Sequence, residues 1–238
     1  MKWRVLLLGL LLQGCAGAAD AKPTFDATVG YEVRTGQPQL VAVRGQSEAS
    51  VIVDAAWLSL GTTELHDREQ SEVVAVPALG ALDHLDSRAK LRHVELRSDA
   101  RYCDVSLAFR PADSQPSAAP AELVGHSILL TGTREGVAFR LASTLDTRIA
   151  PLASCFRLEE DYGGMLFVFD LTVWLRDLPW SKAETDAGGT LVIDGEHSPE
   201  FRREFEARLG RGIELYADTD RDGRLDADWI PLGAGEGV

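Results

Sequence analysis

The chain has 238 residues, in which 24 lysines and arginines face 37 aspartates and glutamates, so its formal net charge is −13 at pH 7. An acidic chain without a basic stripe repels phosphate backbones, and we expect no nucleic-acid partner. Hydrophobic residues make up 45% of the chain, which is enough to build a sizeable core.

The first 14 residues, MKWRVLLLGLLLQG, place two basic side chains ahead of an apolar run over residues 5–12. That run is too short to cross a bilayer as a mature helix. A basic start followed by a short apolar core is typical of a secretory signal peptide. The sequence therefore predicts export, with residues 1–14 as the signal.

The next feature is the order Leu12-Gln13-Gly14-Cys15, which resembles the bacterial lipobox, although the family usually has a smaller residue than Gln13. The resemblance implies that Cys15 is acylated, becomes the mature N-terminus and anchors the protein stably through several acyl chains. The residue after the acylated cysteine is Ala16 rather than aspartate, and by analogy with that family this implies sorting to the outer membrane. Ordinary cleavage after residues 16–18 is the alternative.

Residues 15–23 are small and polar, which suits a tether. From residue 24 apolar and polar side chains alternate, as in a half-buried strand. The turn-forming residues 35–39 predict that the strand at 40–43 forms a hairpin with the first strand. Proline-rich residues 110–120 predict a long loop or linker. The predicted strands cover 24–34, 40–43, 50–60, 72–76, 91–96, 103–109, 127–130, 137–141, 165–175 and 213–216.

One helix is predicted near the C-terminus. Ser198 is placed to cap it, and Pro199 suits its first turn. Phe201, Phe205 and Leu209 follow at the spacing of one helical face. Many short strands and one late helix predict a mainly β protein, an antiparallel β-sandwich with one short C-terminal helix. We expect one domain over residues 24–230 and a flexible tail over 231–238.

Two cysteines remain after Cys15. Cys103 and Cys155 have no local partner in metal-binding spacing, and an even pair in an exported protein predicts a disulfide. The segment 101–107, RYCDVSL, together with the late acidic loop, is loosely similar to uncharacterised β-sandwich lipoproteins of Gram-negative bacteria.

The most informative segment is DTDRDGRLDADW, residues 218–229. It resembles the calcium loops of EF-hands, dockerins and thrombospondin type 3 repeats, in which alternate residues of a tight loop direct oxygens toward a hard cation. Gly223 occupies the position of the sharp turn. The expected ligands are carboxylates and one carbonyl, at Asp218, Asp220, Asp222, Arg224, Asp226 and Asp228.

The loop departs from an EF-hand at its last position, where Trp229 replaces the bidentate glutamate. We therefore expect weak binding, with a dissociation constant of about 10⁻⁴ to 10⁻³ M, as in extracellular modules. A structural ion fits this affinity better than a regulatory one, since a switch requires two helices that reorient. A solvated acidic turn is the alternative.

Other functions have weaker support in the sequence. A glycan-acting hydrolase could use an acid pair from residues 159–161. A periplasmic metal-binding protein would need three donors from distant strands, because the histidines do not fall into metal-binding spacing; they are His66, His84, His93, His126 and His197. We favour a lipid-anchored binding or scaffolding protein of the cell envelope, with calcium as cofactor and an unknown protein or glycan partner.

Overall fold

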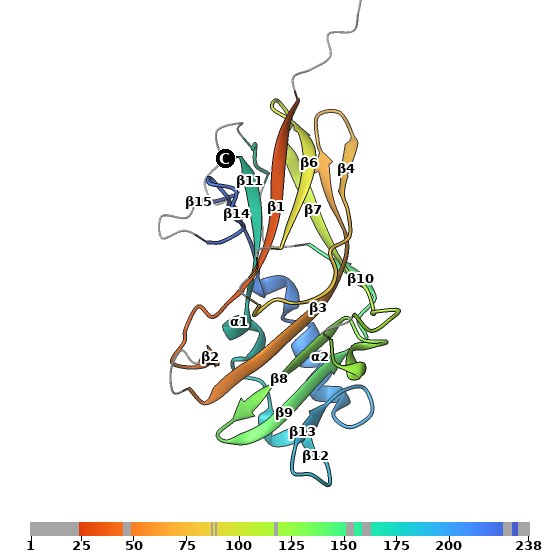
Figure 1. The fold of residues 1–238 in the computed structure, drawn as a ribbon, viewed down its shortest axis with the longest axis vertical. Helices are drawn as coiled ribbons and strands as arrows, with labels where there is room; N and C mark the ends of the chain where they lie inside the picture. The colour runs from red at the N-terminus through yellow and green to blue at the C-terminus, as the bar shows by residue number, and fades with distance from the viewer. Residues whose placement is uncertain are drawn as a thin grey trace, which may run out of the picture.

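A computed structural model describes residues 24–44, 49–86, 88, 90–116, 119–150, 155–158, 163–225 and 230–232. Its strands form two sheets, and two short α-helices lie beside them (Figure 1). The prediction of a mainly β sandwich with little helix is confirmed, although some strand pairs are parallel rather than antiparallel and a second helix precedes the predicted C-terminal one. Cys15 and residues 233–238 of the predicted tail lie outside the described residues. The first two residues of that tail are ordered against the smaller sheet, since Pro231 pairs with Tyr216 and Leu232 is buried.

The smaller sheet, sheet A, has five strands. In spatial order they are β15 (Ile230–Pro231), β14 (Ile213–Ala217), β11 (Gly164–Asp170), β1 (Thr24–Arg34) and β6 (Leu91–Arg97). β1 and β11 pair in parallel, whereas the other pairs are antiparallel. Both faces of β11 are buried, which explains why its sequence is continuously apolar.

The larger sheet, sheet B, is organised around the 17-residue strand β3 (Val51–Asp67). The first half of β3 pairs with β8 and the second half with β7. The spatial order is β10 (Thr147–Ile149), β7 (Tyr102–Phe109), β3, β8 (Ile128–Arg134), β9 (Val137–Ser143), β13 (Leu191–Ile193) and β12 (Glu184–Thr185). Three further strands pair with β3, namely β2 (Val41–Val43), β4 (Glu72–Val76) and β5 (Gly80–Asp83).

The two sheets meet through the inward side chains of β1. Tyr31 stacks on Phe167 with ring centroids 5.4 Å apart, and its hydroxyl lies 3.0 Å from the hydroxyl of Thr63 on β3. Val29 and Val33 are buried on the same side of the strand. The alternation that predicted β1 therefore separates the core side from the opposite side of sheet A.

The two helices lie beside the lower half of sheet B in Figure 1. In α2 (Pro199–Glu206), Phe201 lies 5.1 Å from the ring of Trp180, and Trp180 in turn contacts Phe139 of β9 at 5.3 Å. Phe205 contacts Trp174 of α1 (Leu171–Leu175). Phe201 and Phe205 form the buried face of α2 that the spacing predicted. Leu209 is also fully buried, but it lies beyond the end of α2, in a 3-10 helix (Leu209–Gly212).

Three local predictions were wrong. Residues 165–175 are not one strand, because β11 ends at Asp170, whose carboxylate accepts the Thr172 amide at 2.8 Å and starts α1. Residues 41–43 form no hairpin with β1; β2 pairs in parallel with β3. Ser198 does precede α2, but its hydroxyl donates to the Val192 carbonyl at 2.7 Å instead of capping the helix.

The proline-rich segment after β7 is a loop that packs against sheet B. Ala112 and Ala119 are buried and join a small hydrophobic cluster with Leu123 and Leu129. Ala112 also forms an isolated bridge with Val124. This segment therefore covers part of sheet B rather than separating two halves of the chain.

Candidate metal site in the acidic loop

Strand β14 places the acidic loop at one end of sheet A. The ladder between β11 and β14 ends at the pair Met165 and Ala217. One further hydrogen bond, from the Asp218 amide to the Gly164 carbonyl at 3.0 Å, fixes the first residue of the loop against β11. The predicted strand before the loop is confirmed, and the loop begins on a rigid element.

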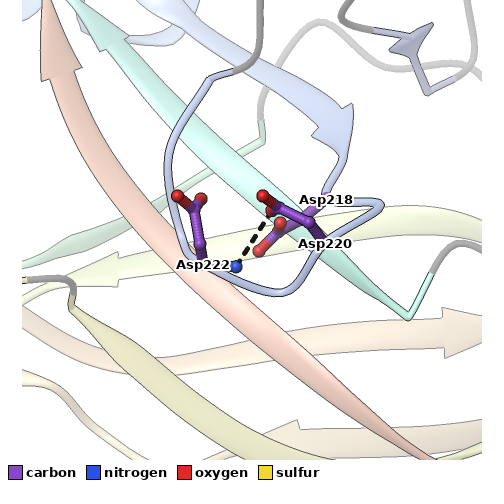
Figure 2. Close-up of side chains that lie close together, drawn as sticks. All are labelled: Asp218, Asp220 and Asp222. Carbon is purple, nitrogen blue, oxygen red and sulfur yellow. Dashed lines mark hydrogen bonds between the residues drawn. The ribbon is translucent and has the colours of Figure 1, made fainter.

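The carboxylates of Asp218, Asp220 and Asp222 come together in this loop (Figure 2). One oxygen from each lies within 4.8 Å of the other two. Hard cations such as Ca²⁺ bind carboxylate oxygens at 2.3–2.6 Å. The three sequence-predicted residues are therefore close enough to share one ion.

The loop backbone fixes the direction of each carboxylate. Asp218 Oδ2 accepts the Gly223 amide at 3.1 Å, Asp220 Oδ1 accepts the Asp222 amide at 3.2 Å, and Asp222 Oδ1 accepts the Arg224 amide at 2.8 Å. These three bonds use one oxygen of each carboxylate. Gly223 has φ of 72°, the left-handed conformation expected at the sharp turn.

Asp218 has the least favourable environment of the three. Its side chain is 1% exposed, and Oδ1 has no hydrogen-bond partner among the described residues. Burial, with a further contribution from the charges of Asp220 and Asp222, raises the pKa of Asp218 to about 6. A buried carboxylate oxygen without a partner destabilises a fold, and a bound cation would remove that cost.

Strand β1 supports the second half of the loop through Glu32, a residue that the sequence analysis did not identify. Glu32 Oε2 accepts the Leu225 amide at 2.7 Å. Burial raises the pKa of Glu32, as does the charge of Asp222. Glu32 and Leu225 are 193 positions apart, so no local pattern could link them.

The loop also rests against sheet A by close backbone contact and by apolar packing. A Cβ built on Gly30 of β1 would lie 3.0 Å from Gly223 Cα, so glycine is needed for this approach. Leu225 packs against a small cluster formed by Leu166, Val168 and Tyr216. The cluster and Gly30 thus hold the loop on the side of sheet A that faces away from sheet B.

The other predicted ligands are described only in part. Arg224 follows the cluster directly, and its amide binds Asp222. Asp226, Asp228 and Trp229 lie outside the described residues, as do residues 159–161 of the proposed acid pair.

The cysteines and histidines have other roles. The disulfide between Cys103 and Cys155 is confirmed, and it lies beside the backbone bridge between Tyr102 and Phe156. Within the described ranges, the three aspartates are the one group of side chains close enough together to share a metal ion, and the group contains no histidine. His197 Nδ1 instead lies 3.0 Å from Asp194.

Comparisons with protein families, curated proteins and solved structures found no match to this chain. Among the described residues, no helix has the length and apolarity required to span a membrane. The functional argument therefore depends on the residues of the loop and their geometry.

Proposed function

We propose that the acidic loop binds one calcium ion, which holds the C-terminal part of the chain on sheet A. The proposed ligands are the carboxylates of Asp218, Asp220 and Asp222, the carbonyl of Arg224, and side-chain oxygens of Asp226 and Asp228. The observation that carries the proposal is the buried Asp218 Oδ1, which has no hydrogen-bond partner among the described residues and belongs to a cluster of three carboxylates.

The surroundings of the loop support a structural rather than a signalling ion. The loop follows a strand, β14, and is fastened to β1 through Glu32 and to sheet A through Leu225. Calcium switches act by reorienting two helices around the ion. At a calcium concentration ten times the dissociation constant, the ion would add only about 1.4 kcal/mol to the free energy of unfolding.

Thermal unfolding with calcium and with a chelator tests this proposal. The wild-type midpoint is expected to rise with calcium, whereas Asp220→Asn is expected to respond little, because the variant lacks one ligand charge. Asp186→Asn is the matched control, since Asp186 is an exposed aspartate whose carboxylate accepts two turn amides far from the loop in the sequence. Equal midpoints of the wild type in calcium and chelator, with no heat of binding by calorimetry, would refute the proposal.

At the level of the cell, we propose a lipid-anchored protein of the outer membrane with a binding or scaffolding role. The support is the leader sequence and the lipobox resemblance at Cys15. A calcium-stabilised sandwich carried on a tether suits such a role, because a rigid β scaffold can present loops to a protein or glycan partner.

Metabolic labelling with radioactive palmitate tests the anchor. Wild-type protein is expected to incorporate label and to fractionate with outer membranes, and Cys15→Ser is expected to do neither. Labelling of Cys15→Ser at the wild-type level would contradict the anchor. Crosslinking in the native envelope would then identify the partner.

A further inference from the structure

A cavity of about 490 Å³ opens beside the acidic loop, where β1 continues beyond its pairing with β6. The pairing of β1 with β6 extends only to Gly30 and Leu91, and β1 residues beyond that pair line the cavity. The other walls come from β2, β3 and the segment between β5 and β6, and Gly223 and Arg224 of the loop complete the lining. This volume is within the range of small-molecule sites.

The charge of this cavity is opposite to that of the chain. Its described lining has five basic and three acidic residues, whereas the whole chain has a net charge of −13. The basic residues are Arg34, Arg44, Arg88, Lys90 and Arg224. Arg34, Arg44 and Arg88 form ion pairs with Glu214, Asp54 and Asp86, respectively. The excess of positive charge nevertheless favours anions over cations in this cavity.

Lys90 provides donors for such an anion. Its side chain is buried, and its ammonium donates to the backbone carbonyl of Asp86. An ammonium has three N–H donors, and the structure assigns a hydrogen bond to one of them within the described residues. Burial lowers the pKa of Lys90, because the charge loses its hydration. An anion in the cavity would replace part of that hydration.

His84 lines the same cavity and is 4% exposed. Neither ring nitrogen makes a hydrogen bond with a described residue; the Tyr31 carbonyl is near the ring but outside hydrogen-bond geometry. Burial and the Lys90 charge lower the pKa of His84 to about 3, so the ring is neutral and offers one N–H donor. Buried polar groups normally have a partner, and a ligand in the cavity would supply one.

We propose that this cavity binds a small molecule through an oxyanion group, such as a carboxylate or a phosphate, which accepts hydrogen bonds from Lys90 and His84. We further expect calcium to strengthen this binding. The loop carboxylates lie next to Gly223 and Arg224 of the cavity wall, so calcium reduces the negative charge near the anion. Because opposite charges attract, the affinity for the anion is expected to be higher in calcium than in chelator.

The coupling rests on the proposed calcium site, but anion binding itself does not. An NMR titration separates the two. Sodium sulfate serves as the probe, with sodium chloride added to keep the ionic strength constant, in calcium and in chelator. Saturable shifts are expected at the amides of Leu85, Arg88 and Gly223, with tighter binding in calcium. A separate calcium titration, followed at the amides of Asp220 and Asp222, shows directly whether the loop takes the ion.

Lys90→Gln is expected to bind sulfate about tenfold more weakly, which is the effect of losing one charge-assisted hydrogen bond. Lys182→Gln is the matched control, because Lys182 is exposed and pairs with Glu200 outside the cavity. If Lys90→Gln does not fold, Arg88→Gln replaces it, since the Arg88 side chain is exposed, and weaker binding is again expected.

The anion proposal is overturned if wild-type shifts do not saturate, or if Lys90→Gln, or Arg88→Gln in its place, binds sulfate as tightly as wild type. A repeat with sodium succinate distinguishes the two ligand chemistries, because preferential binding of succinate indicates a carboxylate ligand and preferential binding of sulfate a tetrahedral one. If the protein binds sulfate but shows no calcium binding at the loop amides, the anion site is supported. The same result would refute the calcium site and the coupling between the two sites.

Discussion

Asp218 combines burial with a carboxylate oxygen that has no described hydrogen-bond partner. This arrangement costs stability when no cation is present, and under the proposal a bound cation offsets that cost. Replacing Asp218 with asparagine should therefore have opposite effects on the free energy of unfolding in chelator and in calcium. In chelator, Asp218→Asn is expected to be at least as stable as wild type, because a buried charge is removed.

In calcium at ten times the wild-type dissociation constant, the wild type is expected to gain about 1.4 kcal/mol that Asp218→Asn does not gain. Urea unfolding of both proteins in both conditions measures the four free energies. A variant that is strongly destabilised in chelator would show that Asp218 serves the apo fold rather than the ion.

His84 gives the molecule a pH dependence that can be assigned to one residue. Its folded pKa of about 3 is below the ordinary value of 6.5, so the unfolded chain takes up a proton before the folded chain does. The contribution of His84 to the free energy of unfolding is therefore expected to be complete above pH 6.5 and to fall by about 1.4 kcal/mol for each pH unit between 6.5 and 3.

His84→Leu should remove this part of the slope while keeping an apolar side chain beside Phe169. The free energies of unfolding of wild type and variant, measured between pH 4 and 8, provide the comparison. The raised pKa of Asp218 contributes with the opposite sign, but it is present in both proteins and cancels. Parallel curves over this range would contradict the assignment.

At the scale of elements, β1 connects the core to the acidic loop. Its inward residues build the core, whereas Gly30 and Glu32 contact the loop. Gly30→Ala would place a Cβ 3.0 Å from Gly223 Cα and 2.8 Å from a methyl of Leu166. The loop must then move, so we expect calcium affinity to fall and the free energy of unfolding to drop by about 1–3 kcal/mol.

Gly61→Ala is the control for this change. Gly61 lies on β3, and an added Cβ there would meet the Arg110 and Ala108 side chains at 2.9 and 3.1 Å. It should lower stability without changing the calcium affinity measured by calorimetry. Equal calcium affinities for Gly30→Ala and wild type would mean that close contact with β1 does not position the loop.

Local sequence patterns predicted the elements better than the pairing between them. The alternation in residues 24–34 identified β1 because one face of that strand is buried, and the spacing of Phe201 and Phe205 identified the buried face of α2. The same spacing placed Leu209 in the helix, but the helix ends before it. The parallel pairing of β1 with β11 joins segments far apart in the chain, and no local pattern carries that information. The contact between Glu32 and the acidic loop could not be predicted for the same reason, since the two segments are far apart in the chain.

At the scale of the whole molecule, the disulfide between Cys103 and Cys155 ties β7 to the segment that precedes β11. The two cysteines are 52 positions apart, so the crosslink is expected to stabilise the fold by roughly 4 kcal/mol in the chain-entropy model. The double variant Cys103→Ser with Cys155→Ser should lose about this amount in urea unfolding. A loss below about 1 kcal/mol would show that the noncovalent core already fixes this segment.

The cysteine pair could be predicted because an even number of cysteines in a chain predicted to be exported favours a disulfide. The aspartate cluster could be predicted because its spacing is local. The cavity beside β1 could not, since its walls come from β1, β2, β3, the segment before β6 and the acidic loop. His84 and Lys90 show no local spacing that distinguishes them, and their role depends on burial that only the assembled fold provides.

The central claim is that the acidic loop holds a calcium ion, and a crystal structure grown in calcium tests it most directly. We expect one anomalous-scattering peak among the carboxylates of Asp218, Asp220 and Asp222 and the carbonyl of Arg224, with metal–oxygen distances of about 2.3–2.6 Å. Asp218 Oδ1 should be among the bound oxygens. A loop that contains only water at millimolar calcium, with Asp218 Oδ1 bound to no cation, would contradict the account.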